Sequence, residues 1–192
     1  MELFSPVNSK FNFAEMKMEP EGELITRNLT DMDWMFKDQR AVEKLKAEDP
    51  QIYRYYNVKI PEEKGHLQHC ISVINPGKIG EEYYMTKGHF HARKETAEVY
   101  YTIQGRGKLL LQSVTDKKPE VQVLEMEKGS LSYVPPCWAH RCVNTGNEEL
   151  VFAGIYPGDA GHIYGEIEEK GFARLIVERE GRPAIIDNLK YG

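Results

Sequence analysis

Long apolar runs are missing from this sequence, and none approaches the roughly 20 residues that a helix needs to cross a bilayer. The N-terminal stretch MELFSPVNSKF also lacks the basic-then-apolar pattern of a signal peptide. Cysteine occurs only three times, an odd number that argues against a disulfide framework and favours a reducing cytoplasm. There is no excess of basic residues, because the formal net charge is −5 and the pI is about 5.7. We therefore expect a cytoplasmic protein with neither nucleic acid nor a membrane as its partner.

The N-terminal part differs from the rest of the chain in its periodicity. Residues 1–28 show no regular pattern, so irregular chain with short extended pieces is expected there. Thr30 with Asp33 resembles a helix N-cap with its reciprocal acid, and Asp38 predicts the cap of a second helix that ends before Pro50. Three apolar side chains recur at helical spacing between these caps: Met32, Met35 and Phe36. We interpret the segment as a helical flap that packs on a sheet through this stripe.

From about residue 52 onward the periodicity is that of short β-strands. Turn signals such as Asn75-Pro76-Gly77 separate the runs. The expected strands are residues 52–60, 68–75, 81–86, 97–104, 107–113, 121–127, 130–135, 140–144 and 150–157. A final hairpin is expected from residues 173–180 and 183–188, which either closes a sheet or pairs with another subunit. The chain is therefore predicted to be an all-β protein without internal repeats.

The stretch TKGHFHARKETAEVYYTIQG carries the strongest chemical signal. His89 and His91 are two residues apart, so both imidazoles lie on one face of an extended strand. Glu98 follows a short polar turn on an expected return strand, and such a hairpin would place its carboxylate opposite the two imidazoles. His140 offers a third imidazole. An isolated H-x-H is more often a surface or packing feature, but three imidazoles and a carboxylate suit a divalent first-row metal and leave coordination positions open.

The spacing of these residues resembles the two motifs of the cupin family. Glu98 is followed by six residues and Gly105, as in the first motif. Gly129 is followed by five residues and Pro135, and His140 by three residues and Asn144, as in the second. The resemblance implies a cupin double-stranded β-helix, or jelly-roll barrel, with a short helical segment near the N-terminus. It further implies one domain over residues 1–192: an N-terminal irregular and helical extension (1–50), a barrel core (51–160) and a C-terminal loop and hairpin (161–192).

The chain departs from the cupin motifs at three positions. Tyr83 and Cys137 stand where the family has glycine, and the gap between His91 and the glutamate is longer than usual. Glu95 occupies the usual spacing, but it lies in a charged turn. Glu98 keeps the downstream glycine and lies on an apolar strand, so we assign Glu98 as the ligand.

A closer resemblance, to the archaeal cupin-type glucose-6-phosphate isomerases, extends from about residue 30 to residue 187. It rests on TKGHFHA, PPCWAHRCVNTG and IYPGDAGHIYGEIEEKGF together. The resemblance implies a homodimeric enzyme of glycolysis and gluconeogenesis that interconverts glucose 6-phosphate and fructose 6-phosphate. It implies one divalent metal per subunit, Fe²⁺ first, although such ligands also accept Ni²⁺, Mn²⁺ or Zn²⁺. The implied metal ligands are His89, His91, Glu98 and His140, and the implied substrate contacts are Tyr53, Ser72, Thr86, Gly88, Tyr100, Tyr156, His162 and Tyr164.

Two residues are expected to move protons. Glu98 is the best-placed base for shuttling a proton between C1 and C2 through an enediolate, and His162 is left for ring opening because imidazole titrates near neutrality. A hydride shift between the two carbons remains an alternative.

Two other function classes fit the same metal ligands. A non-haem iron cupin dioxygenase can use three histidines and one glutamate, but the polar groups around the site fit a sugar phosphate better. A non-enzymatic sugar-binding cupin often carries a DNA-binding helix-turn-helix, and we expect no room for one after Asp187.

Overall fold

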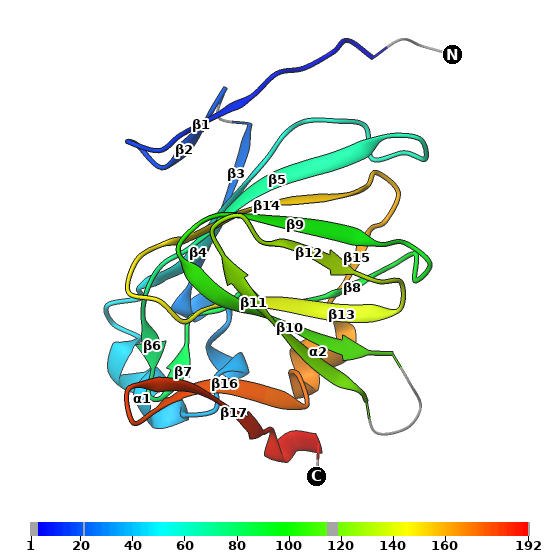
Figure 1. Cartoon of the computed structure of the whole chain (residues 1–192). Coiled ribbons are helices and arrows are strands. Elements are labelled where there is room, and N and C mark those ends of the chain that lie inside the picture. Colours follow the sequence, from blue (N-terminus) through cyan, green and yellow to red (C-terminus); the bar gives the residue numbers. More distant parts are fainter. Residues whose placement is uncertain (1–3, 21, 115–118, 192) are drawn as a thin grey trace.

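Two antiparallel sheets form the centre of the molecule (Figure 1). The structure is a computed structural model and describes residues 4–20, 22–114 and 119–191. The larger sheet has the strand order β12-β9-β14-β5-β4-β3, and the smaller has the order β11-β10-β13. The strands of the larger sheet are β3 (Glu23–Asn28), β4 (Gln51–Asn57), β5 (Leu67–Ile74), β9 (Glu98–Gln104), β12 (Leu131–Val134) and β14 (Leu150–Pro157). Those of the smaller sheet are β10 (Arg106–Ser113), β11 (Val121–Glu127) and β13 (Trp138–Asn144). The prediction of an all-β jelly roll is confirmed.

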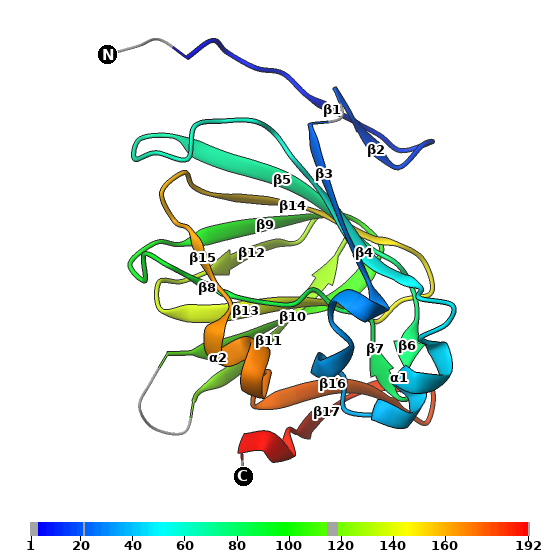
Figure 2. The same ribbon diagram turned by 180° about the vertical axis from the view of Figure 1, so that it is seen from behind.

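Short sheets complete the molecule at its ends (Figure 2). A four-stranded sheet has the order β17-β16-β7-β6, and two further pairs are β1 with β2 and β8 with β15. Their bounds are β1 (Lys10–Asn12), β2 (Lys17–Glu19), β6 (Lys78–Ile79), β7 (Glu82–Tyr83), β8 (Phe90–His91), β15 (His162–Ile163), β16 (Arg174–Arg179) and β17 (Arg182–Asp187). The predicted C-terminal hairpin is confirmed as β16 and β17, and it joins β7 of the same chain through the pair Val177 and Glu82.

The hydrophobic core lies between the two large sheets. Leu109, Leu110 and Leu111 of β10 are all buried, so this strand is covered on both faces. From the larger sheet, Ile74 and Phe152 contribute fully or almost fully buried side chains. Each such side chain contributes about 1.5–3 kcal/mol relative to an exposed position, which explains why these strands read as apolar runs.

The helical flap forms as predicted at its second helix and differently at its start. Asp38 caps α1 (Gln39–Leu45), because its Oδ1 accepts from the N–H groups of Arg40 at 3.1 Å and Ala41 at 3.0 Å. The predicted cap at Thr30 is wrong. The Thr30 N–H and hydroxyl donate to Asp49 at 2.8 and 3.0 Å, so its hydroxyl is engaged elsewhere.

Two 3-10 turns replace the predicted first helix. They are η1 (Leu29–Asp31) and η2 (Asp33–Met35). Two further short helical elements lie near the other end of the chain: α2 (Gly165–Lys170) and η3 (Leu189–Tyr191). Asn28 and Asp31 form the capping box at η1. The predicted stripe is nevertheless confirmed as core, since three side chains are buried: Met32, Met35 and Phe36.

The expected hairpin between the histidine strand and the glutamate strand is wrong. β8 pairs with β15, and His89 forms a bridge with His140 of β13, so this segment extends the smaller sheet. β9 lies instead between β12 and β14 in the larger sheet. After the turn closed by Thr96 N–H and the Arg93 carbonyl, the chain crosses from one sheet to the other. Glu98 and the histidines therefore meet across the interior between the sheets.

Candidate active site

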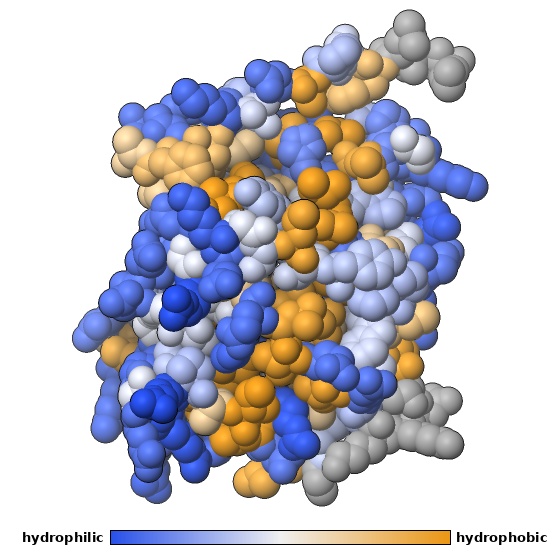
Figure 3. All heavy atoms as spheres, viewed as in Figure 1, coloured by the Kyte–Doolittle hydropathy of each residue, from blue (hydrophilic) through white to orange (hydrophobic). Residues whose placement is uncertain are grey.

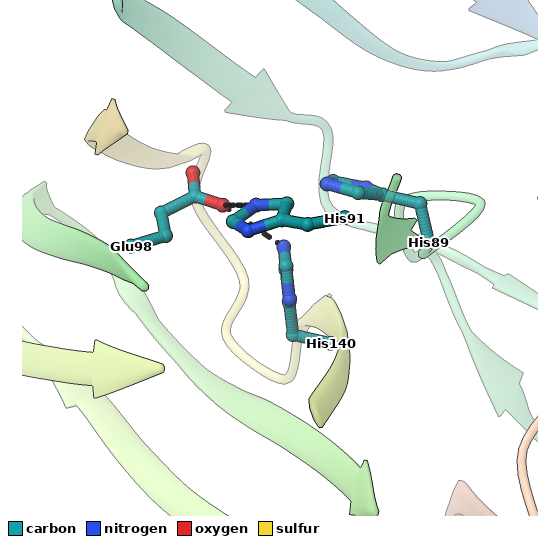
Figure 4. Close-up of side chains that lie close together, drawn as sticks. All are labelled: His89, His91, Glu98 and His140. Carbon is teal, nitrogen blue, oxygen red and sulfur yellow. Dashed lines mark hydrogen bonds and ion pairs between the residues drawn. The ribbon is translucent and has the colours of Figure 1, made fainter. Parts of the chain in front are cut away.

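Four side chains converge at one point between the two sheets (Figure 4). His89 and His91 come from the β8 segment, His140 from β13 and Glu98 from β9. One ligand atom from each lies within 4.8 Å of the others. Glu95, by contrast, is exposed and pairs with Arg93 at 3.0 Å.

Hydrogen bonds fix how His91 presents its ring nitrogens. The Thr96 hydroxyl donates to the Arg93 carbonyl at 2.6 Å, so its oxygen accepts from His91 Nδ1–H at 2.8 Å. In the neutral ring, Nε2 then carries a lone pair, and it lies 3.2 Å from Glu98 Oε2. A ligating histidine that donates its other N–H to an oxygen has the orientation typical of metal sites.

His140 and His89 complete a set of atoms that a cation would satisfy. His140 Nδ1 faces the Trp138 carbonyl at 3.4 Å, so Nε2 is left as an acceptor 3.0 Å from Glu98 Oε2. Among the described residues, the buried Nε2 atoms of His140 and His89 have no hydrogen-bond partner. Lone pairs that face a carboxylate repel it, whereas three neutral imidazoles and a carboxylate suit a divalent cation. The residues present therefore fit a metal.

The protonation of the cluster follows from burial and mutual charge. Burial alone would raise the pKa of Glu98, but the charge and N–H groups that His140, His91 and His89 present whenever they are protonated outweigh it and hold that pKa well below its usual range. Burial, with His140 and His162 nearby, lowers the pKa of His89. Burial also lowers the pKa of His162 below 6.5. An ionised carboxylate and neutral imidazoles are the forms that bind a cation.

A cavity of about 160 Å³ opens beside the cluster. Every substrate contact implied by the resemblance lines it: Tyr53, Ser72, Thr86, Gly88, Tyr100, Tyr156, His162 and Tyr164. Three of the four expected metal ligands also line it, and His91 is buried behind them. The wall therefore combines the metal-ligating cluster with hydroxyl groups.

His162 and two tyrosines cover one side of the cavity. The His162 ring centroid lies 4.4 Å from that of His89 and 5.5 Å from that of Tyr156. Tyr164 lies near His89 as well, with ring centroids 6.2 Å apart. Tyr156 lies on β14, and His162 and Tyr164 follow that strand in the chain, so β14 and the residues after it bring one imidazole and two phenols next to the cluster.

Sequence reasoning did not select six residues that line this cavity: Tyr55, Asn57, Glu62, Cys70, Cys142 and Phe152. Strand parity could have found most of them, since alternate residues share a face. Tyr55 follows Tyr53 by two positions, and their rings stack with centroids 6.4 Å apart. Cys70 precedes Ser72 in the same way. No such signal marks Glu62, which lies outside the strands.

Lys87 lines the cavity with its neighbours, but its amine is engaged elsewhere. Lys87 Nζ lies 5.0 Å from the centre of the Trp34 ring and 3.8 Å from Glu168 Oε1. The position contributes backbone rather than a free ammonium to the cavity.

A family model and several curated relatives agree on one family. A family model described as glucose-6-phosphate isomerase matches residues 26–190. A glucose-6-phosphate isomerase of Thermococcus gammatolerans is 44% identical over 100% of this chain and 99% of its own length. One of Pyrococcus furiosus is 45% identical over 86% of each chain, and a putative glucose-6-phosphate isomerase of Rhizobium meliloti is 32% identical over 94% of this chain and 84% of its own. Among solved structures, an oxalate oxidase has a TM-score of 0.44 and 14% identity over 53% of this chain and 47% of that one.

Proposed function

The chain belongs to the glucose-6-phosphate isomerase family, and from that premise we propose how its residues interconvert glucose 6-phosphate and fructose 6-phosphate. The observation that carries the proposal is the four-residue cluster on the wall of a cavity rich in hydroxyl groups. The decisive experiment converts fructose 6-phosphate to glucose 6-phosphate with protein stripped of metal and reloaded with one metal at a time. Failure of every metal-loaded form to convert the sugar phosphate would contradict the function.

The metal is held by His89, His91, Glu98 and His140, and we propose Fe²⁺ as the native ion. When bound, a divalent ion supplies Lewis-acid stabilisation of negative charge on the sugar oxygens. Since the same ligands accept Ni²⁺, Mn²⁺ and Zn²⁺, the test is the metal content of protein purified without oxygen, followed by the reloading series. Full activity with another ion and none with Fe²⁺ would overturn the choice of iron.

The substrate phosphate is held by the Thr86 hydroxyl, the Gly88 N–H, Ser72 and one or both of Tyr156 and Tyr164. All five residues line the cavity, which supports this role. A dianion needs several donors, and each hydrogen bond to a charged group contributes about 1.5–3 kcal/mol. Thr86→Val is expected to raise KM for fructose 6-phosphate far more than it lowers Tm. An equal loss with unphosphorylated fructose would count against a phosphate role.

Glu98 and His162 carry the proton transfers. Glu98 lies at the cavity wall as a carboxylate and acts as the base for the C1–C2 proton, while His162 passes a proton to the ring oxygen during ring opening. The depressed pKa of His162 keeps its imidazole neutral at pH 7, so it first takes the proton of the C1 hydroxyl and then passes that proton to the ring oxygen. In deuterium oxide, deuterium at C2 of newly formed glucose 6-phosphate would support the enediolate route. Near-normal turnover of metal-loaded Glu98→Gln would refute the base assignment.

We also propose that two copies of the chain associate through an apolar surface, called here the outer patch: Val99, Tyr101, Leu131, Tyr133 and Ile155. These residues share the outer face of the larger sheet, because Leu131 pairs with Tyr101 and both Tyr133 and Ile155 pair with Val99. Leu131 is 73% exposed and Tyr133 is 57% exposed. Figure 3 shows hydrophobic side chains gathered over β9, β11 and β12. Contiguous apolar patches of this kind mark interaction surfaces.

Light scattering coupled to size-exclusion chromatography tests the dimer. Leu131→Lys should lower the mass to that of one chain, because a charge in an apolar interface is costly. The matched control is Leu189→Lys, since Leu189 is 82% exposed near the C-terminus and outside the outer patch. A two-chain mass for Leu131→Lys, equal to that of the control and of the unaltered protein, would place the interface elsewhere. A one-chain mass for the unaltered protein would contradict the dimer itself.

The location of the protein is proposed to be the cytoplasm. All three cysteines are free, as expected in a reducing compartment: Cys70, Cys137 and Cys142. Among the described residues, no helix has the length and apolar character needed to span a membrane. Cell fractionation with an antibody to the protein tests the proposal.

A further inference from the structure

Arg141 is a buried cation directly behind the active site. It follows His140 on β13, and alternate strand residues face opposite sides, so its side chain points away from the metal-ligating cluster. Only 2% of the residue is exposed. Its guanidinium carbon lies 4.7 Å from the centre of the buried Phe172 ring. Arginine is almost never buried without a partner, so its contacts need an explanation.

The main contact of Arg141 is a backbone carbonyl of the substrate-binding segment. Arg141 Nε and Nη2 donate to the Lys87 carbonyl at 3.2 and 2.6 Å. The residues before and after Lys87 and Gly88 form ordinary backbone hydrogen bonds with β13. The Thr86 N–H donates to the Cys142 carbonyl at 2.9 Å, and the His89 N–H donates to the His140 carbonyl at 3.2 Å.

Two residues, Lys87 and Gly88, therefore lie opposite one residue of β13, which is the arrangement of a β-bulge. The bulge leaves the Lys87 carbonyl without a partner in the ladder, and the arginine side chain supplies that partner.

Fixing the Lys87 carbonyl also fixes the Gly88 N–H. The two groups belong to one trans peptide, in which they point in opposite directions. Gly88 lines the cavity, and over the described part of the chain its N–H donates to no protein group. The φ of Gly88 is +75°, and a Cβ there would lie 2.7 Å from Phe172 Cε2. The segment is thus shaped so that a free backbone donor faces the cavity.

The charge of Arg141 is balanced only remotely. No ion pair among the described residues brings a carboxylate within 4.0 Å of it. Glu82 interacts with it electrostatically, but Glu82 Oε2 already accepts from the Lys37 N–H at 2.8 Å. A buried charge without a close counter-ion is unfavourable, and its field acts strongly on neighbours in a low-dielectric interior. An anion bound at the Lys87–Gly88 segment would relieve this cost.

We propose that Arg141 is a positioning residue for the substrate phosphate: it holds the Lys87 carbonyl so that the Gly88 N–H faces the cavity, and its charge favours an anion there. The inference rests on the proposed function, in which Thr86 and Gly88 bind the phosphate. Arg141 itself does not line the cavity, so it acts through the backbone.

The test compares metal-loaded Arg141→Met and Arg141→Lys with the unaltered enzyme. Loss of the guanidinium is expected to raise KM for fructose 6-phosphate, and the calorimetric Kd of inorganic phosphate, by about tenfold to a hundredfold. The kcat should change by less than about threefold, since remote binding contacts are not transition-state contacts at C1 and C2. Arg141→Lys keeps the charge but not the planar pair of donors, so it should recover only part of the affinity.

Arg54→Met is the matched control, because Arg54 on β4 of the larger sheet is an arginine with a mostly buried side chain that pairs with Glu149 at 3.1 Å. It should leave KM and phosphate affinity unchanged. Unchanged phosphate affinity in folded Arg141→Met overturns the inference, as does a loss of metal and kcat at constant KM, which would mean that Arg141 supports His140 instead. If the Met variant does not fold, an unchanged phosphate Kd in Arg141→Lys overturns the positioning role. Arg141-dependent phosphate binding in an enzyme that converts no sugar phosphate would refute the proposed function and leave this inference standing.

Discussion

Replacing Thr96 with valine should weaken metal binding without removing any ligand. The Thr96 hydroxyl accepts from His91 Nδ1–H at 2.8 Å and donates to the Arg93 carbonyl at 2.6 Å. Valine has nearly the same shape but can neither accept nor donate. In the variant, His91 Nδ1 keeps only the Thr96 carbonyl, at 3.3 Å. The ring then loses the contact that fixes both its rotation and the nitrogen that carries the proton.

The size of the effect follows from the role of such outer hydrogen bonds. Removing one commonly lowers metal affinity by about 10- to 100-fold, or about 1.4–2.8 kcal/mol. Folding should change less, because one hydrogen bond contributes only about 0.5–1.5 kcal/mol to stability. The separation between these two effects distinguishes an orienting role from general destabilisation.

Competition with a chelator of known affinity measures the metal Kd, and thermal unfolding of metal-free protein measures stability. The matched control is Thr102→Val, because Thr102 is fully buried and its hydroxyl has no partner among the described residues. That variant should bind metal normally. Equal metal affinity for Thr96→Val and unaltered protein would refute the orientation argument.

Three further predictions concern the cluster. Glu95→Gln should leave metal content and activity nearly unchanged because Glu95 is exposed, whereas Glu98→Gln should lower metal content; the reverse result in metal analysis would show that the ligand assignment is wrong. Burial lowers the pKa values of His89 and His162 below 6.5, so at acid pH the metal-free folded state binds fewer protons than the unfolded chain. The contribution of these two histidines to the free energy of unfolding is therefore fully present above pH 6.5 and is lost as the pH falls below it. A urea midpoint that rises between pH 7.5 and 5.5 would contradict this sign. Gly154→Ala would place a Cβ 2.9 Å from Glu98 Oε1, so it should reduce metal content while circular dichroism stays unchanged; normal metal content would mean that Glu98 can move aside freely.

The strands and most of the candidate site could be predicted from the sequence because both depend on short-range patterns. The apolar run of β10 and the alternation around His89 and His91 are local properties of the chain. The cap at Asp38 is equally local, since its oxygen bonds to N–H groups two and three residues away. The prediction failed at Thr30, where the deciding partner, Asp49, lies 19 residues away.

The pairing of the strands could not be predicted, because it depends on which sheet each strand joins. Two neighbouring strands joined by a short turn usually form a hairpin, and the residues from His89 to Glu98 fit that expectation. The structure instead pairs β8 with β15, bridges His89 to His140 of the smaller sheet and places β9 in the larger sheet. The same carboxylate still meets the same imidazoles, since both faces point into the interior. The four candidate ligands therefore come together even though the predicted topology of the two strands was wrong.

Arg141 shows why a buried charge can escape a reading of sequence. Within HRCVN it reads as a solvent-facing residue of a strand that alternates, but residues 139–144 are all buried, so neither face of this part of β13 meets solvent. Its position also changes the electrostatics of the site. With the proposed divalent cation bound, three neutral imidazoles, Glu98 and the ion would together carry a charge of about +1, and Arg141 adds a second positive charge behind residues 86–88. A phosphate dianion bound at the proposed place would therefore meet a local positive charge of similar size, although the whole chain carries −5. On the proposed function, this balance would let a cavity lined mostly by neutral hydroxyls hold a doubly charged substrate.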